Sequence, residues 1–388
     1  MSFVQDRLPV VTVVREQLED REIANYSPLS DRFDLRLVTT TVAGPYGATG
    51  LGLPVRRARS RGQLLGNAGS RLTRRLVGRH VDLDAVPSLP SALQEADVVV
   101  VNETHMASSA AAAEMRARGG PPVVTVCYEN IPFRYEDEQR LRARKAMVRR
   151  WTDAFVALTP EAARALDLEG VPASRVHTIT YGVDPARFAR IPPPDVRSGW
   201  GAAEDDVVVL YTGRLLKEKG LVPLLVAFAG TGSHRARLVL VGEGPELPRI
   251  LQAAGALGIA DRVFHAGWVS DSEIPGVLAS ADIFVLPSLP TPYWEEQLGF
   301  SMIEAMAAGL PVVAVASGSI PFVLGHGGLT ARPYDVSGLT DALTQVLTSR
   351  ELRGELGAAG RERVADTLNI QRAAAGLAEV LARLTSAM

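Results

Sequence analysis

The sequence contains a single cysteine, Cys127, so it cannot form an intramolecular disulfide bond or a zinc site built from several cysteines. Such scarcity is typical of proteins in a reducing compartment. Long apolar runs are also absent: stretches such as LVPLLVAFA fall far short of the ~20 residues that a membrane-spanning helix needs. The first residues, MSFVQDRLPVV, lack the apolar core of a secretion signal. We therefore expect a cytoplasmic protein.

The chain has little excess charge of either sign. Lys and Arg number 41 and Asp and Glu 43, which gives a formal net charge of -2. No global positive field is available to attract nucleic acid, so we expect no nucleic-acid partner. The charge is unevenly divided, because residues 1–190 carry 26 basic and 22 acidic side chains and the remainder carry 15 and 21. The N-terminal half is therefore the basic one.

Two series of short apolar runs alternate with helical stretches. The first series lies at 10–14, 35–40, 97–101, 122–127, 154–158 and 176–180, and the second at 207–213, 237–242, 262–267, 282–288 and 311–316. Continuous Val, Ile and Leu runs of this kind are typical of parallel strands buried on both faces. The proline-rich stretch RIPPPDVRSGW separates the two series.

This pattern predicts an α/β fold of two doubly wound parallel-sheet, Rossmann-like domains that face each other across a cleft. We expect an N-terminal acceptor-binding domain at residues 1–190 and a C-terminal nucleotide-sugar-binding domain at 200–370. The amphipathic segment 371–388 is expected to be a helix that packs back on the N-terminal domain.

A basic turn, TGRLLKEKG, follows the strand predicted at 207–213. Ligands of open parallel sheets bind at the carboxyl ends of strands, which is where this turn lies. Gly213 and Gly220 allow the backbone to approach a ligand. Arg214 offers a bidentate guanidinium and Lys219 a mobile ammonium, a combination suited to phosphate oxygens.

A second glycine-containing strand end, LVLVGEGPEL, supplies Gly242 and Gly244 just before a helix. Each motif is weak by itself. On charge patterning alone, Arg214 and Lys219 are equally well explained as solvated loop charges.

An acidic motif strengthens the interpretation as a phosphate site. In EEQLGFSMIEAMAAG, the backbone amides of Gly299, Phe300 and Ser301 open a helix and can receive a diphosphate. Glu304 lies one turn inside this helix and Glu296 precedes it, so both can reach hydroxyl groups beside the phosphates. The alternative for Glu304 is a favourable interaction with the helix dipole.

In their joint order, these motifs resemble the retaining glycosyltransferases of family 4, which have the GT-B fold. The matching pieces are GRLLKEKG, LVLVGEGPE, VFHAGWVSDSEI, ADIFVLPS, EEQLGFSMIEAMAAGLPVVA and GGLTARPYDVSGL. The segment TITYGVDPARF is similar to the family's link between domains, although Tyr181 stands where asparagine is usual. The resemblance covers roughly residues 150–365.

The resemblance implies a donor site in the C-terminal domain. Arg214 and Lys219 would hold the diphosphate, Glu304 the ribose hydroxyls, and Glu296 the hydroxyls of the transferred sugar. The base would meet three consecutive residues, Gly267, Trp268 and Val269.

The resemblance also implies the reaction, which is transfer of a hexose with retention from a UDP- or GDP-sugar to a glycan, a lipid-linked or a small-molecule acceptor. The basic clamp would stabilise the departing diphosphate, and no enzymic nucleophile is assigned. Two cationic side chains make a metal or other cofactor unnecessary, and DLD at 82–84 is expected to be a loop rather than a manganese site.

The N-terminal domain departs from the family pattern. The strand VVTVV runs into REQLEDREI where many members have a glycine-rich loop, and CYENIPF follows a strand after which a histidine is common. Glu129 lies near that position and either contacts the donor sugar or the acceptor hydroxyl, or makes structural hydrogen bonds. Glu103 and His105, in NETH, are expected to face the same cleft, although a lone loop histidine is often without function.

Two arginine-rich stretches complete the domain. The first contains Arg56, Arg57, Arg59, Arg61, Arg71, Arg74, Arg75 and Arg79. The second, RLRARKAMVRRW at 140–151, could lie on an anionic membrane through Leu141, Met147, Val148 and Trp151. A solvated helix packed on the sheet explains it equally well.

Two other functions share the expected architecture. A non-hydrolysing nucleotide-sugar epimerase would need no acceptor, but the acidic motif argues against it. A non-catalytic sugar-nucleotide-binding protein is disfavoured by the complete set Arg214, Lys219, Glu296 and Glu304. Acceptor-dependent release of nucleotide would separate a transferase from both.

Overall fold

The computed structural model describes residues 7–16, 19–40, 52–60, 63–64, 85–189 and 196–386. The chain divides into two compact units, one made of Met1–Tyr181 with Ile370–Met388 and the other of Gly182–Asn369. Several sequence predictions lie outside the described residues, namely those on Arg61, Arg71, Arg74, Arg75, Arg79, the DLD stretch at 82–84 and the proline-rich residues 190–195.

The first unit contains a parallel sheet. Its described strands have the order β3-β2-β1-β4-β5-β6-β7. Their bounds are β1 (Val10–Arg15), β2 (Asp34–Thr39), β3 (Val55–Arg57), β4 (Val98–Asn102), β5 (Val123–Cys127), β6 (Ala154–Ala157) and β7 (Val176–Thr178). The order reverses between β1 and β4, and ligands of open sheets bind at such a switch point.

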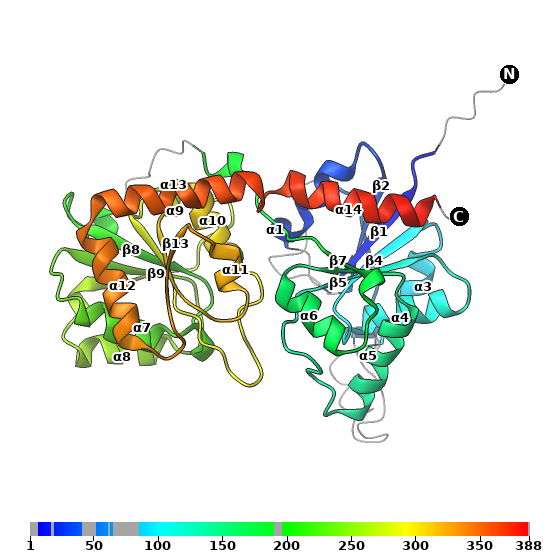
Figure 1. The fold of residues 1–388 in the computed structure, drawn as a ribbon, viewed down its shortest axis with the longest axis horizontal. Coiled ribbons are helices and arrows are strands. Elements are labelled where there is room, and N and C mark those ends of the chain that lie inside the picture. The colour runs from blue at the N-terminus through cyan, green and yellow to red at the C-terminus, as the bar shows by residue number, and fades with distance from the viewer. Residues whose placement is uncertain are drawn as a thin grey trace. The chain divides into compact units, whose positions relative to one another are not determined.

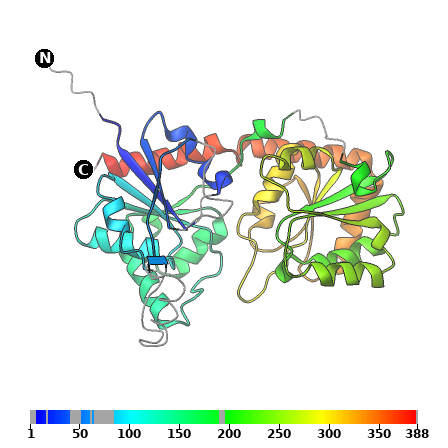
Figure 2. The same ribbon diagram turned by 180° about the vertical axis from the view of Figure 1, so that it is seen from behind.

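Helices cover both faces of this sheet (Figures 1 and 2). They include α1 (Asp20–Ile23), α3 (Leu89–Ala92), α4 (Ala107–Ala117), α5 (Gln139–Trp151), α6 (Pro160–Leu168) and the C-terminal α14 (Ile370–Thr385), with short 3-10 turns η1 (Ser27–Leu29) and η3 (Ala173–Arg175). Val99 and Val101 of β4 pack against Ala112 of α4 on one face. On the other face, α14 packs against η1 and β4.

The second unit repeats this architecture with the strand order β10-β9-β8-β11-β12-β13. The bounds are β8 (Val207–Thr212), β9 (Ala236–Val241), β10 (Val263–Gly267), β11 (Ile283–Leu286), β12 (Val312–Val315) and β13 (Gly328–Ala331), and all pairs are parallel. Here the order reverses between β8 and β11.

The helices of the second unit form two groups on its sheet (Figures 1 and 2). One group contains α7 (Leu221–Gly230), α8 (Leu247–Ala256) and α12 (Val336–Thr348). The other contains α9 (Ile274–Ala279), α10 (Phe300–Ala308), α11 (Ile320–Leu324) and α13 (Arg350–Asp366). Four 3-10 turns are η4 (Pro185–Arg187), η5 (Ser198–Trp200), η6 (Lys217–Lys219) and η7 (Ala260–Arg262).

The expected fold class is confirmed, because both sheets are parallel and doubly wound. Every predicted apolar run contains a strand, but β3 and β13 were not predicted as strands. Both lie at the edge of their sheet and lack a continuous apolar run, reading VRR and GLTA. Among the described residues, no helix has the length and apolarity needed to cross a bilayer.

Candidate functional site

The basic turn after β8 is held in shape by a buried tyrosine. The Tyr211 hydroxyl, in a fully buried side chain, donates a 2.8 Å hydrogen bond to the carbonyl of Arg214. Gly213 has a positive φ of 150°, and a Cβ there would lie 2.9 Å from the Tyr211 hydroxyl. This bond from Tyr211 therefore fixes the conformation of the turn, and the Arg214 side chain is exposed to solvent. Our sequence analysis assigned Tyr211 no role, although it lies two residues before Gly213.

The other end of the turn packs against the segment that follows β11. Gly220 has a φ of 67°, and a Cβ there would lie 2.0 Å from the carbonyl oxygen of Pro287. Leu289 donates its backbone N–H to the carbonyl of Glu218 at 2.8 Å. This close approach requires glycine and brings Lys219 beside the acidic motif.

Lys219 and Glu296 form the centre of the site. The ammonium Nζ of Lys219 lies 2.7 Å from Oε2 of Glu296, and the hydroxyl of Ser288 donates to the same oxygen at 2.7 Å. Lys219 Nζ also lies 4.6 Å from the centre of the Trp294 ring, which allows a cation–π interaction. Glu296 is only 8% exposed, so its carboxylate is fixed by these partners.

The helix predicted to receive a diphosphate begins where expected. Gly299, with a φ of 72°, is the N-cap of α10, and Phe300 is its first residue, followed by half-buried Ser301. A Cβ on Gly299 would lie 3.7 Å from Cγ of Glu296, so the helix start and this glutamate are neighbours. Glu304 lies one turn inside and is 4% exposed.

Gly242 and Gly244 have a packing role in this structure. A Cβ on Gly242 would lie 2.0 Å from the carbonyl oxygen of Gly213, and one on Gly244 would lie 2.2 Å from that of Leu215. The backbone N–H of Gly242 also donates to the carbonyl of Gly267 at 2.7 Å. The glycines thus let the loops after three strands pack together, while their contact with a ligand stays a prediction.

The residues expected at the base lie at the end of β10. Gly267 has a φ of 74°, and the indole of Trp268 is 57% exposed, whereas Val269 is half-buried. An exposed indole on a fixed loop offers an aromatic surface, but whether it contacts a base stays a prediction.

The basic turn and the acidic motif lie together at the switch point of the second sheet. Arg214 and Lys219 follow β8, and Glu296 and the start of α10 follow β11, the strand beside it. The structure brings Lys219, Glu296 and Gly299 together and leaves Arg214 at the exposed rim. A cation, a helix N-terminus and a carboxylate in one place can bind a phosphorylated sugar.

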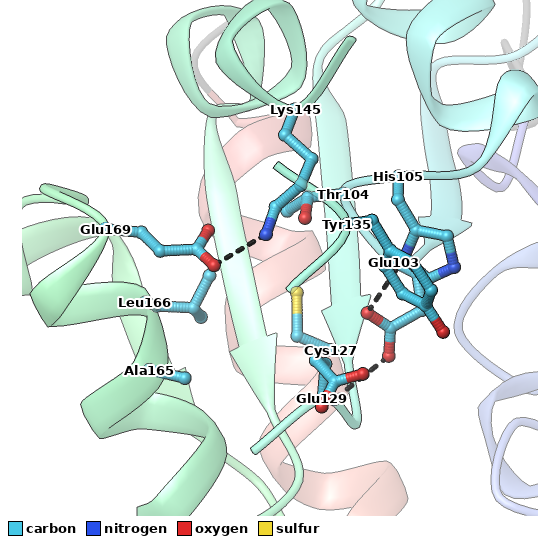
Figure 3. Close-up of a pocket in the computed structure, with 10 residues that line it drawn as sticks. All are labelled: Glu103, Thr104, His105, Cys127, Glu129, Tyr135, Lys145, Ala165, Leu166 and Glu169. Carbon is cyan, nitrogen blue, oxygen red and sulfur yellow. Dashed lines mark hydrogen bonds and ion pairs between the residues drawn. The ribbon is translucent and has the colours of Figure 1, made fainter. Parts of the chain in front are cut away.

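A polar pocket lies in the first unit, at the ends of β4 and β5 (Figure 3). Its lining includes Glu103, His105, Cys127, Glu129, Tyr135 and Lys145. The Glu129 carboxylate accepts from the backbone N–H of Ile131 at 3.0 Å and lies 3.3 Å from Nε of Arg134. Burial raises the pKa of Glu129. These bonds fit the structural role considered for Glu129, and its contact with substrate stays a prediction.

The basic helix α5 contributes an ion-pair network that was not predicted. Lys145 is 2% exposed, and its Nζ lies 2.7 Å from Glu169 and 3.4 Å from Glu136. Arg149 pairs with the same two carboxylates. Val148, expected on a membrane-facing side, is fully buried against protein, whereas Leu141, Met147 and Trp151 are half-buried, and membrane contact of α5 stays a prediction. The signal available in the sequence was the spacing of Lys145 and Val148, one turn apart on a helix.

No group of three or more His, Cys, Asp or Glu side chains placed to hold a metal ion occurs within the described part of the chain.

Comparison with sequence families gives two matches that follow one another along the chain. The profile described as "Glycosyltransferase Family 4" matches residues 33–187, and the one described as "Glycosyl transferases group 1" matches residues 194–363. Together they span most of both units.

Individual relatives are similar over part of their length. A GDP-mannose-dependent alpha-(1-6)-phosphatidylinositol monomannoside mannosyltransferase from Mycobacterium tuberculosis is 34% identical over 218 residues, which are 54% of this chain and 56% of that protein. A 2-deoxystreptamine glucosyltransferase from Streptomyces kanamyceticus is 32% identical over 250 residues, 60% of this chain and 61% of that protein. The chain thus spans little more than half the length of these relatives.

Solved structures show the same fold. The crystal structure of Anabaena HepE in complex with UDP and glucose superposes with a TM-score of 0.77 at 19% identity, covering 97% of this chain and 100% of that one. The glycosyltransferase WaaG, involved in lipopolysaccharide biosynthesis, superposes with a TM-score of 0.67 at 18% identity, covering 94% and 98%.

Proposed function

Because the chain belongs to family 4 of the glycosyltransferases and has the GT-B fold, we propose that it transfers a hexose from a nucleotide-diphosphate sugar to a hydroxyl acceptor. The reaction proceeds with retention at the anomeric carbon. The acceptor is a glycan, a lipid-linked sugar or a small molecule.

The observation that carries this proposal is the contact between Lys219 and Glu296 at the switch point of the second sheet. The ammonium of Lys219 lies directly beside the carboxylate of Glu296, which supports recognition of a diphosphate and of sugar hydroxyls at neighbouring positions. Ser288 holds the carboxylate from the other side. A site of opposite charges 2.7 Å apart suits a ligand that joins an anionic group to a polyhydroxyl ring.

The chemistry required of the site is stabilisation of a leaving group. The bond between the anomeric carbon and the diphosphate oxygen breaks, and the acceptor oxygen bonds to the same face of that carbon. The acceptor proton ends on the released diphosphate. Arg214, Lys219 and the amides at the start of α10 oppose the charge that develops on the diphosphate. The two cationic side chains stabilise this charge without a metal ion.

Two nucleosides, uridine and guanosine, are candidates for the donor. The relative from Mycobacterium tuberculosis is named for GDP-mannose, and HepE was crystallised with UDP. We propose a UDP- or GDP-hexose as donor, with the base beside Trp268 and the ribose beside Glu304.

A thermal-shift panel of nucleotides and nucleotide sugars in EDTA tests the donor site, because a ligand that binds only the folded state raises the melting temperature. We expect stabilisation by one diphosphate series. An acceptor screen with that donor should then give acceptor-dependent nucleotide release. Isomerisation of the donor without acceptor would instead indicate an epimerase, and binding without turnover a non-catalytic protein.

A further inference from the structure

Glu103 has an unusual position at the end of β4. Its backbone φ is 56°, a left-handed conformation that residues with a Cβ rarely adopt, and the residue is 6% exposed. One carboxyl oxygen, Oε1, accepts hydrogen bonds from the backbone N–H groups of Tyr128 at 2.7 Å and Glu129 at 3.1 Å. Glu103 therefore ties the end of β4 to the chain that leaves β5.

The second oxygen of Glu103 has no such partner among the described residues. Oε2 lies 3.9 Å from Nδ1 of His105, too far for a direct hydrogen bond. One hydroxyl oxygen with two bonds of ~2.8 Å spans this gap when the bonds meet at roughly a right angle. His105 is held by its ring against Tyr135, with centroids 4.4 Å apart, and by its carbonyl, which accepts from Arg144. Figure 3 shows Glu103, His105 and Tyr135 side by side in the pocket.

Burial fixes the protonation of this pair. It raises the pKa of Glu103 to about 8, aided by the charge of Glu129, and lowers the pKa of His105 to about 4, aided by nearby cations. At neutral pH a carboxylic acid thus faces a neutral imidazole. The other titratable and charged groups around them are Cys127, Glu129, Arg134, Arg144, Lys145 and Glu169.

The charges of the pocket favour a neutral ligand. Lys145 is engaged by Glu169 and by the carbonyl of Arg134, and the Arg134 side chain by Glu129. Lys145 and Arg134 are thus paired with carboxylates, and Arg144 donates to the His105 carbonyl, so an anionic ligand would have to compete with these partners for the cations. A hydroxyl group fits, because it can accept from protonated Glu103 and donate to His105 at the same time.

We propose that Glu103 and His105 bind one hydroxyl group of a neutral polyol acceptor, which bridges Oε2 of Glu103 and Nδ1 of His105. This inference rests on the proposed transferase function. It adds an acceptor contact beside Glu129, at the ends of β4 and β5, and the expected acceptor is a sugar or cyclitol rather than a phosphate-bearing group.

The acceptor KM across pH tests the proposal. In the natural protein it should rise as pH passes about 8, because Glu103 loses its donor proton, and as pH falls toward about 4, because His105 loses its acceptor nitrogen. Glu103→Gln keeps an oxygen for the two backbone N–H groups and an N–H that donates at every pH. It should therefore retain the neutral-pH acceptor KM and lose the alkaline rise.

Removal of either side chain should weaken binding of the acceptor but not of the donor. His105→Phe keeps a ring against Tyr135 and should raise the acceptor KM about tenfold, the loss of one hydrogen bond, with the donor KM unchanged. Glu103→Ala should do at least as much, and Glu103→Gln covers the case in which that variant does not fold. Glu114→Ala, at an exposed position of α4 in the same unit, is the control and should change neither KM. Unchanged acceptor KM in Glu103→Ala and His105→Phe would mean that the gap holds a buried water only and would overturn the proposal.

A direct binding measurement separates this proposal from the proposed function. The His105 ring nitrogens are followed by 15N NMR while methyl α-D-glucopyranoside or inorganic phosphate is added. A shift with the glycoside alone supports the hydroxyl site even if no transfer is found. A shift with phosphate alone, or with neither probe, refutes it even if transfer is found.

Discussion

At the scale of single residues, the donor site depends on the pairing of Lys219 with Glu296, which the separate sequence motifs do not predict. Lys219 and Glu296 are separated by 77 positions, yet their side chains meet at 2.7 Å. The sequence supplied both residues and a reason for each, namely phosphate and hydroxyl recognition. The contact between their side chains shows that the two are partners, and the close approach of Gly220 to Pro287 brings their segments together.

Arg214→Ala and Lys219→Ala should each lower kcat/KM for transfer by about tenfold or more, because each removes positive charge from the departing diphosphate. The measurement is steady-state release of nucleotide with the identified donor and acceptor. Lys217→Ala, on the same turn and exposed, is the matched control and should change little. Near-normal transfer in either clamp variant would remove that residue from the mechanism.

The roles of some other residues in the two sites could not be predicted, because a local sequence pattern does not show which polar side chains are buried. Tyr211 sits in an ordinary apolar strand, and only its bond to the Arg214 carbonyl shows that it shapes the basic turn. Lys145 belongs to a helix rich in arginine, and its one-turn spacing from Val148 is a weak local sign that it is the buried cation. Such roles require the contacts between segments that are distant in sequence.

At the scale of elements, the sequence predicted the strands that have a continuous apolar run and missed two edge strands that lack one. Central strands such as β8 and β9 are buried on both faces, so their apolar runs are continuous. The helix start at Phe300 was predictable because a glycine and an apolar helical pattern mark it.

Gly220 provides an element-scale prediction about the loop between β8 and α7. Gly220→Ala should destabilise the protein by about 2 kcal/mol or more, because the left-handed φ of 67° is costly for alanine and its Cβ would meet the Pro287 carbonyl. It should also weaken donor binding, because the same approach brings Lys219 to Glu296. Thermal or urea unfolding and nucleotide titration measure the two effects.

Gly354 in α13 is the control for that substitution. It has ordinary backbone geometry, and nothing lies within 4 Å of an added Cβ. Gly354→Ala should therefore stabilise by about 0.5–1 kcal/mol, as expected for glycine in a helix interior. Equal effects of the two alanine substitutions would show that the loop has no special requirement for glycine.

At the scale of the whole molecule, the C-terminal helix follows the second unit in sequence but belongs to the first. α14 comes after α13, yet the unit that contains it is the one formed by Met1–Tyr181. Its buried side chains are Ile370, Ala373, Ala374, Leu377, Ala378, Val380 and Leu381. Gly376 allows a close approach to Ile179, whose side-chain carbons would lie 3.2 Å from an added Cβ. The second unit, in contrast, is the continuous segment Gly182–Asn369.

This connectivity predicts unequal independence of the two units. Burial of each large aliphatic side chain of α14 contributes about 1.5–3 kcal/mol, so four of them match a large part of the 5–15 kcal/mol that stabilises an ordinary domain. A chain that ends at Asn369 should therefore lose the first unit's unfolding transition or show it at much lower temperature. Leu377→Ala should lower that transition, and Glu379→Ala, at an exposed position of the same helix, should not.

The segment 182–369, expressed alone, should fold and bind the same nucleotide diphosphate as the full chain, because the clamp, the acidic motif and α10 all lie within it. Calorimetric titration with UDP and GDP, together with circular dichroism, measures both properties. Transfer should be absent, since the acceptor residues that we propose lie in the other unit. A folded segment that binds no nucleotide would show that the donor site needs residues from outside Gly182–Asn369, and would remove the switch point of the second sheet as its sole basis.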